Sequence, residues 1–294
     1  AVYGLTGWLI AQERTRAVLA VQVGMNGINI LLDVIFVLGL GWGVKGVAVA
    51  TVIAEVSGAA LGLWFCRDAF RAPAWRDAAR VFDRSRLANM LSVNGDILLR
   101  SLMLQAIFVS FLFLAADFGD VQLAATQVLM QFLQLSAFVL DGFAFAAEAF
   151  VAQAFGAGRV DRLRRGALLA SAWAVGLVAA LAAGFALAGG AVIDLMTTSE
   201  EVRAAALVYL PWVVLAPLAG VGAFMLDGIF IGATRARDMR NMMALSAAIY
   251  ALAVAALVPV LGHHGLWAAL IVSFVARAST LALRYPALER AAAG

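Results

Sequence analysis

The segment 121–155 is long and apolar, yet polar side chains recur along it at a fixed spacing. About 20 apolar residues cross roughly 30 Å of hydrocarbon as a helix, so the segment can form a tilted membrane span. Four polar residues recur at every seventh position and a fifth stands one turn after the first: Gln127, Gln134, Asp141 and Glu148, with Gln131. Because seven residues make almost two helical turns, these side chains share one slowly drifting face.

Two interpretations of this polar face compete. Carboxylates in contact with lipid are costly, so the face must meet protein or a water-filled cavity. Gln and Asp side chains also join neighbouring helices by hydrogen bonds inside membrane bundles. A whole line that includes two acids favours a polar cavity inside a helical membrane bundle.

The composition of the chain is that of an integral membrane protein. Of the 294 residues, 64% are hydrophobic and 13% are charged, whereas a soluble domain is about half apolar and a quarter charged. The single cysteine, Cys66, excludes an internal disulfide. The adjacent His263 and His264 lack metal-site spacing and are expected in a loop. No motif of a hydrolase, a phosphate loop or a zinc site occurs, so we expect no enzyme, no cofactor, no metal and no nucleic-acid partner.

Long apolar runs recur along the chain and predict an all-α, polytopic helical bundle with about eight full transmembrane helices. The runs cover residues 18–38, 47–65, 91–115, 121–154, 166–188, 204–233, 241–261 and 264–284. Arginine-rich loops at 14–16, 67–86, 159–165, 235–240 and 284–290 alternate with loops that hold few basic residues. The positive-inside rule places the arginine-rich loops in the cytoplasm.

An internal repeat suggests two related lobes. Residues 7–16 and 228–237 share Gly, Ile, a small residue and two Arg at equal offsets, and 40–50 resembles 261–269. Many transporters are built from repeated halves. We therefore expect the end of a fourth helix and helices five and six at 1–66, a cytoplasmic linker at 67–90, and six further helices at 91–294. The opening residues read as the last turns of a helix, so we treat the sequence as a fragment of a longer protein.

Polar residues also stand inside the first two full spans. Asn26, Asn29 and Asp33 share one face of the first, and Thr51 lies on the second. Their oxygens suit a hard cation such as Na⁺, and a sequestered carboxylate can equally carry a proton. Hydrogen bonds that lock two helices together would explain the same residues.

Other charges within the spans have open roles. Asp96 and Arg100 are one turn apart and predict a local ion pair. Asp227 is expected to line the cavity, with the arginines at 235–240 as an alternative partner. Glu55 and Arg277 are single charges that either pair with another residue or extend toward the membrane surface.

Four segments together resemble the multidrug and toxic compound extrusion (MATE) family in its DinF branch. They are LGWGVKGVAVATVIAE at 40–55, RSLMLQ at 100–105, LDGFAFAAEAFVAQAFGAG at 140–158 and LDGIFIGATRARDMRN at 226–241. Family members have twelve helices in two lobes and export organic, often cationic compounds in exchange for H⁺ or Na⁺. The resemblance implies helices five to twelve here, in a monomeric multi-pass protein of the bacterial inner membrane.

The resemblance also implies a coupling site. In prokaryotic members of this branch, a cation or proton site combines an acid on helix one, an Asn and an Asp on helix five, and a Thr on helix six. Asn29, Asp33 and Thr51 match the last three by spacing and helix. The NorM-like branch places acids on helices seven and ten; Asp227 falls near the second, whereas helix seven offers Arg100 and Gln105.

The expected function is a cation-coupled antiporter that works by alternating access. The expected substrate-cavity residues are Gln127, Gln131, Gln134, Asp141, Glu148 and Asp227. A related flippase for lipid-linked precursors would need several cationic residues for pyrophosphate, whereas this lining consists of Gln, Asp and Glu. A membrane enzyme would need clustered His, Asp or Ser, and a purely structural bundle would not need the line of acids.

The arginine-rich segment 67–86 yields a topology prediction. A cysteine introduced by Ala74→Cys in the full-length protein should resist impermeant thiol reagents added to intact cells and react after the cells are opened. The cytoplasmic placement of this segment follows from the density of arginines between apolar runs. Labelling of this cysteine from outside intact cells would show that the topology is inverted.

Overall fold

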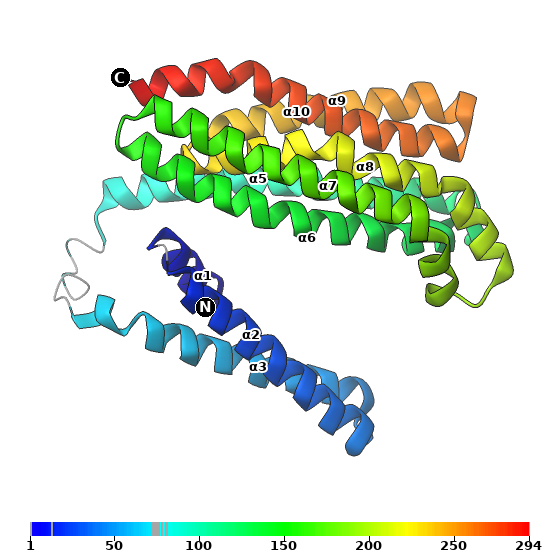
Figure 1. Ribbon diagram of the computed structural model, residues 1–294, viewed down its shortest axis with the longest axis horizontal. Coiled ribbons are helices and arrows are strands. Elements are labelled where there is room, and N and C mark those ends of the chain that lie inside the picture. Colours follow the sequence, from blue (N-terminus) through cyan, green and yellow to red (C-terminus); the bar gives the residue numbers. More distant parts are fainter. Residues whose placement is uncertain (1, 13, 72–76, 78, 80–81, 294) are drawn as a thin grey trace. The chain divides into compact units, whose positions relative to one another are not determined.

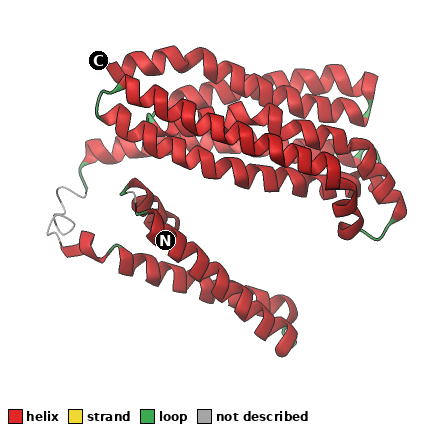
Figure 2. Ribbon diagram, in the orientation of Figure 1, coloured by secondary structure: helices red, strands yellow, loops and turns green. Residues whose placement is uncertain are grey.

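The computed structural model describes residues 2–12, 14–71, 77, 79 and 82–293, and helices dominate throughout (Figures 1 and 2). The chain forms two compact units, Ala1–Leu87 and Ala88–Gly294, each considered by itself below. The boundary falls within the linker expected at 67–90. Residues 72–76, 78 and 80–81 of that linker, including the labelling position Ala74, lie outside the described residues.

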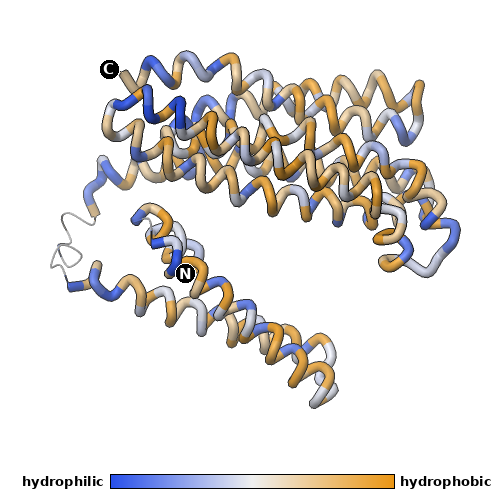
Figure 3. Tube along the Cα trace, viewed as in Figure 1, coloured by the Kyte–Doolittle hydropathy of each residue, from blue (hydrophilic) through white to orange (hydrophobic). Residues whose placement is uncertain are grey.

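Eight helical segments of the described chain are long and apolar enough to cross a membrane, as the sequence predicts. They are α2 (Thr15–Asp33) with its continuation η1 (Val34–Gly39), α3 (Gly43–Phe65), α5 (Arg84–Ala116), α6 (Asp120–Gly156), α7 (Val160–Met196), α8 (Glu200–Gly232), α9 (Ala236–Leu261) and α10 (His263–Ala293). Several of these helices are longer than the apolar runs of the sequence, because a helix can continue into water where its charged side chains are solvated. Figure 3 shows apolar residues along the helices and hydrophilic ones gathered near many of their ends.

In the first unit, the short helix α1 (Val2–Ala11) accompanies a hairpin of α2 and α3. Small residues on α3 recur at every fourth position and are all buried: Gly46, Ala50, Ala54, Gly58 and Gly62. A Cβ added at Gly58 would stand 2.9 Å from the Met25 sulfur. Small residues at this spacing let membrane helices approach closely, so the stripe fixes the α2–α3 contact.

The helix that carries Asp33 changes its winding at that residue. From Val34 the backbone forms the π-helical segment η1, in which the Leu40 amide donates to the Ile35 carbonyl. A π-helical turn inserts one extra residue into a helix and shifts the side chains that follow. Asp33 therefore stands where regular α-helical packing ends.

The second unit is a bundle of six helices, α5 to α10. Helix α6 packs against α7 and α8, and α10 packs against α8 and α9. One buried cluster includes Phe111, Leu129 and Trp267, and another includes Leu163, Phe230 and Leu288. Large apolar side chains on the outer surface suit contact with lipid.

The expectation that the two histidines lie in a loop is wrong. Gly262, with φ +58°, makes the turn alone, so α10 begins at His263. His263 is buried, with its Nε2 3.1 Å from the Thr126 hydroxyl and its ring stacked on Phe118. The Trp212 indole donates to Nδ1 of His264 over 3.0 Å. Among the described residues, no group of three or more His, Cys, Asp or Glu could hold a metal ion.

Helices α6 and α8 meet backbone to backbone at two glycines. A Cβ added at Gly228 would collide with the backbone of Ala144, and one added at Gly232 would collide with the backbone of Glu148. The two glycines are four residues apart, so they lie on one face of α8. This small-xxx-small spacing is typical of close helix crossings in membranes. It brings the second half of the polar line on α6 against α8.

This crossing predicts that Gly232→Ala lowers stability. The added methyl group meets backbone that cannot rotate away, and overpacking of this kind costs about 1–3 kcal/mol. Gly176→Ala on α7 is the matched control, because nothing lies within 4 Å of its added Cβ. Thermal unfolding of the full-length protein in detergent should show a lower midpoint for Gly232→Ala alone. Equal midpoints would mean that the crossing does not need glycine.

Candidate functional site

A cavity of about 570 Å³ lies among α5, α6, α8 and α10 of the second unit. Its polar lining consists of Arg100, Ser101, Gln105, Gln134, Asp141, Glu148, Asp227 and Arg277. Apolar side chains, among them Leu104, Phe108, Phe145 and Phe224, complete the walls. A largely apolar cavity of this size with a few convergent polar groups is typical of sites for drug-sized molecules.

Four of the six residues expected in a substrate cavity line this one: Gln134, Asp141, Glu148 and Asp227. Gln127 and Gln131 are exposed and do not line this cavity, so their expected role in a substrate cavity stays a prediction. A spacing of seven residues drifts by about 20° at each step along a straight helix, so a line of this length cannot keep one orientation. On α6 the cavity lining begins only at Met130.

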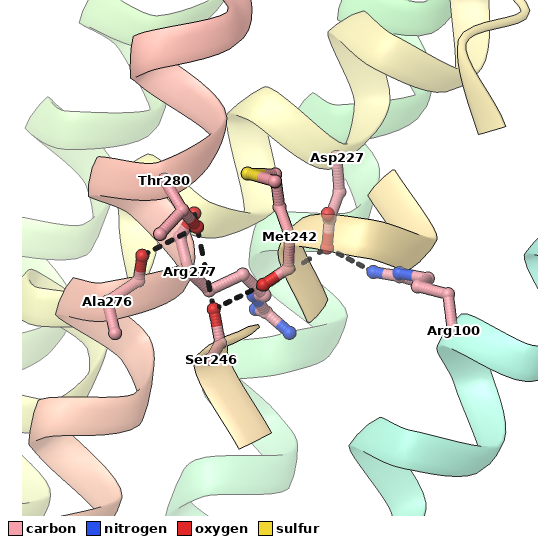
Figure 4. A network of polar contacts seen from close by, with 7 residues as sticks. All are labelled: Arg100, Asp227, Met242, Ser246, Ala276, Arg277 and Thr280. Carbon is pink, nitrogen blue, oxygen red and sulfur yellow. Dashed lines mark hydrogen bonds and ion pairs between the residues drawn. The ribbon is translucent and has the colours of Figure 1, made fainter. Parts of the chain in front are cut away.

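Asp227 stands between two arginines from different helices (Figure 4). Its Oδ2 accepts a hydrogen bond from Nη2 of Arg100 on α5 and lies 3.8 Å from Nε of Arg277 on α10. Asp227 and Arg277 are buried and Arg100 is largely buried, with exposed side-chain fractions of 8%, 3% and 14%, respectively. The Arg277 guanidinium also lies 5.2 Å from the centre of the Phe224 ring. Asp227 thus ties three helices together at the cavity wall.

Helix α9 joins the same region through hydroxyl groups (Figure 4). Ser246 donates to the Met242 carbonyl over 2.8 Å, and Thr280 donates to the Ala276 carbonyl over 2.8 Å. The two hydroxyl oxygens are 3.5 Å apart across α9 and α10. Each hydroxyl is therefore satisfied by its own helix while it contacts the neighbouring one.

The local ion pair predicted between Asp96 and Arg100 does not form. Asp96 pairs with Arg240 on α9 at 2.5 Å, and Arg100 turns to Asp227. A pair one turn apart on a helix contributes only about 0.3–0.5 kcal/mol, whereas a buried charge without a partner is far more costly. Partners from neighbouring helices therefore decide the pairing.

The structure also settles the partners left open for two other charges. Asp227 does not reach the arginines at 235–240; Arg235 pairs instead with Asp238 over 3.0 Å. Arg277 pairs with Asp227 and, at 3% exposure, does not extend to the surface. Sequence reasoning missed Arg100 and Arg277 as cavity residues. A lone arginine inside an apolar span is the signal that could have found them.

The two acids on α6 have different surroundings. No hydrogen bond or ion pair to Asp141 or Glu148 occurs within the described part of the chain. Asp141 lies within electrostatic range of Arg100, Asp227 and Arg277, whereas Glu148 has no ion pair with any described residue. The four clustered side chains carry two positive and two negative formal charges. Glu148 is therefore the uncompensated charge of the cavity.

The first unit holds the other candidate residues. Asn29 Nδ2 and Asp33 Oδ1 are buried and have no hydrogen-bond partner among the described residues. Thr51 is exposed in this unit, and its hydroxyl donates to the Val47 carbonyl over 2.9 Å. Asn26 instead donates to the Gln22 carbonyl on its own helix. Within the described chain, no hydrogen bond from Asn29 or Asp33 joins two helices. Nothing there supports the interpretation that these residues serve to hold helices together.

Comparison with known proteins gives consistent matches along the chain. Residues 97–257 match the family model described as MatE. The chain is 40% identical over 285 residues to DNA damage-inducible protein F of Escherichia coli (strain K12). The match covers 95% of this chain and 61% of that protein. The chain is also 27% identical over 271 residues to Protein DETOXIFICATION 44, chloroplastic, of Arabidopsis thaliana. This match covers 90% of this chain and 50% of that protein.

The fold has counterparts among solved structures. A mutant of the Vibrio cholerae MATE transporter VcmN matches with a TM-score of 0.88 and 19% identity, over 98% of this chain and 66% of that chain. At this identity the match concerns the fold alone. The chain spans about 61% and 50% of the two curated relatives it matches.

Proposed function

Because this chain belongs to the MatE family of transporters, we propose that the protein it is part of is a multidrug efflux antiporter. It exports organic, often cationic compounds across the bacterial inner membrane in exchange for H⁺ or Na⁺. The chain is a multi-pass membrane protein of a transporter family, not of an enzyme family. In this proposal the first unit is part of the N-terminal lobe, and the second unit is the C-terminal lobe.

The observation that carries the proposal is the carboxylate of Glu148. It lines a drug-sized cavity and has no ion partner among the described residues. Leu104, Phe108 and Phe145 contribute apolar and aromatic walls to the same cavity. A carboxylate beside aromatic rings favours an organic cation, because the charge finds its counter-ion while the apolar body is removed from water.

A flippase for lipid-linked precursors is the alternative function. The expectation that the cavity lining consists only of Gln, Asp and Glu is wrong, because Arg100 and Arg277 also line it. Both arginines face Asp227, however, and the whole polar lining has a formal surplus of negative charge. Pyrophosphate needs a surplus of positive charge. The charge balance therefore supports the antiporter.

We place the coupling site at Asn29, Asp33 and Thr51. The unpartnered oxygen of Asp33 can accept a proton or contribute to Na⁺ binding. Protonation removes the Asp33 charge and changes what the carboxyl group can hydrogen-bond, which biases the equilibrium between two lobe arrangements. The π-helical segment η1, which begins at the next residue, gives this change a route into the backbone.

The cavity proposal is tested by neutralising its acids in the full-length protein. We expect Glu148→Gln and Asp141→Asn to lower resistance of cells to organic cations at unchanged protein level, because each removes negative charge from the cavity wall. Glu201→Gln is the matched control, since Glu201 is exposed in the first turn of α8 and outside the cavity. Wild-type resistance in both cavity variants would make the polar line structural.

The coupling proposal is tested in proteoliposomes under an imposed pH or Na⁺ gradient. Asp33→Asn keeps the shape of the side chain but cannot titrate, so gradient-driven efflux should be abolished while drug binding remains measurable. Thr51→Ala removes one neutral oxygen and should weaken coupling less. Asn26→Ala is the control, because its amide is already engaged by Gln22. Wild-type efflux by Asp33→Asn under both gradients would place coupling elsewhere.

A further inference from the structure

A groove of about 440 Å³ lies among α7, α8 and α10, and none of its lining residues belongs to the cavity described above. Its walls are largely apolar and include Leu168, Leu226, Ile229 and Ala282. Leu168 is 71% exposed, so the groove opens on the outer surface of the bundle. Exposed apolar surface on a membrane-spanning helix suits contact with lipid. The groove therefore faces the acyl chains of the membrane.

An ion pair between two helices forms one end of the groove. Nε and Nη2 of Arg164 on α7 donate to the two carboxylate oxygens of Glu289 on α10 over 2.5 and 2.6 Å. The Glu289 side chain is 13% exposed, whereas that of Arg164 is 61% exposed. The carboxylate is thus covered and holds the guanidinium in a fixed orientation. Nη1 of Arg164 takes no part in the pair, so a group that arrives from the membrane meets a positioned donor first.

The charges around this end of the groove are mainly positive. The start of α7 and the end of α10 lie side by side, since a Cβ added at Gly158 would stand 3.7 Å from the Ala292 carbonyl oxygen. Residues 159–165 and 284–290 contain six arginines and two acids. Each acid is paired with an arginine. The remaining four are exposed and form no ion pair within the described part of the chain: Arg162, Arg165, Arg284 and Arg290.

Hydroxyl groups follow the arginine within the groove. Ser171 lines the groove two turns after Arg164, about 10 Å further along α7. Tyr285 lines it on α10, one turn before Glu289. The groove thus combines exposed cations at one end with hydroxyl groups and apolar walls further in. This order matches the phosphate, the ester groups and the acyl chains of a phospholipid.

We propose that this groove binds an anionic phospholipid from the leaflet on the arginine-rich side of the membrane. The phosphate lies on Arg164, and an acyl chain lies against Leu168 and Ala282. Charge selects this occupant, because basic groups beside membrane helices attract anionic headgroups. A zwitterionic phospholipid can fill the same apolar walls, but it adds a cation to a cluster of arginines. The site goes beyond the proposed export function and uses none of the cavity residues.

Two fluorescent lipids with the same acyl chains test the proposal on delipidated full-length protein in detergent. Phosphatidylglycerol carries a net negative charge, whereas phosphatidylcholine is zwitterionic. We expect phosphatidylglycerol to bind at least about tenfold more tightly, since one hydrogen bond to a charged group is worth that much. Equal binding of the two lipids, or binding of neither, would overturn the proposal.

A soluble headgroup shows whether the lipid or a free phosphate ester is the ligand. An equal concentration of sn-glycerol 3-phosphate should leave phosphatidylglycerol bound, because this competitor lacks the acyl chains that contact Leu168 and Ala282. Displacement of the lipid by this competitor would make the free ester the ligand and refute a lipid site.

Variants distinguish this groove from general attraction to a basic surface. Arg164→Gln should remove the preference for phosphatidylglycerol, whereas the matched control Arg237→Gln should keep it. Arg237 is exposed at the start of α9, in another arginine-rich segment and outside the groove. An equal loss of preference in both variants would show surface attraction and refute the assigned site.

Two further variants leave the net charge of the protein unchanged. Arg164→Gln combined with Glu289→Gln removes one charge of each sign and leaves no carboxylate without its arginine, yet the preference should still be lost. Ala282→Trp places a large side chain at an exposed position in the groove wall. It should weaken both lipids at least about tenfold, the equivalent of two buried CH₂ groups. Retained preference in the double variant, or unchanged binding by Ala282→Trp, would contradict the assignment.

Discussion

The second unit is organised by a carboxylate that must be neutralised where no bulk water can do so. Asp227 lies between Arg100 and Arg277, and its side chain is 8% exposed. In a membrane interior, each of these three groups would be costly alone. Their mutual compensation holds α5, α8 and α10 at defined positions around the cavity. Breaking a buried pair by removing one partner costs more than the pair itself contributes. The charge network is therefore best understood as fixing geometry, with little net contribution to stability.

The glycine crossing lies beside the charge network on α8 and complements it. Gly228 and Gly232 let α6 approach α8 until the backbones touch at Ala144 and Glu148. The approach places Glu148 on the cavity wall beside α8 instead of at the lipid surface. The cavity wall is thus set both by paired charges and by close packing of small residues. The unequal charge distribution that supports the proposed substrate class follows from this combination.

The first unit uses the same principles at smaller scale. A stripe of small residues on α3 sets the approach of α2, and buried polar atoms of Asn29 and Asp33 are left without partners in the described chain. The α-helical winding ends at Asp33 and continues as the π-helical segment η1. In the proposed function, this unsatisfied acid at a change of winding is where a proton or cation acts on the backbone. Both units therefore hold buried polar atoms without partners in the described chain at the sites proposed for function.

The sequence determined the properties that depend on one helix at a time. Length and apolarity gave the eight spans, the arginine loops gave an expected orientation, and the seven-residue spacing placed Asp141 and Glu148 on one face. The tertiary structure decided which charges meet. Periodicity specifies the face on which a side chain lies but not the helix packed against that face, so Arg100 was assigned to Asp96 although it pairs with Asp227 on α8. The same reason explains why Gln127 and Gln131 lie outside the cavity and why the pairing of Arg277 with Asp227 came to light only in the folded bundle.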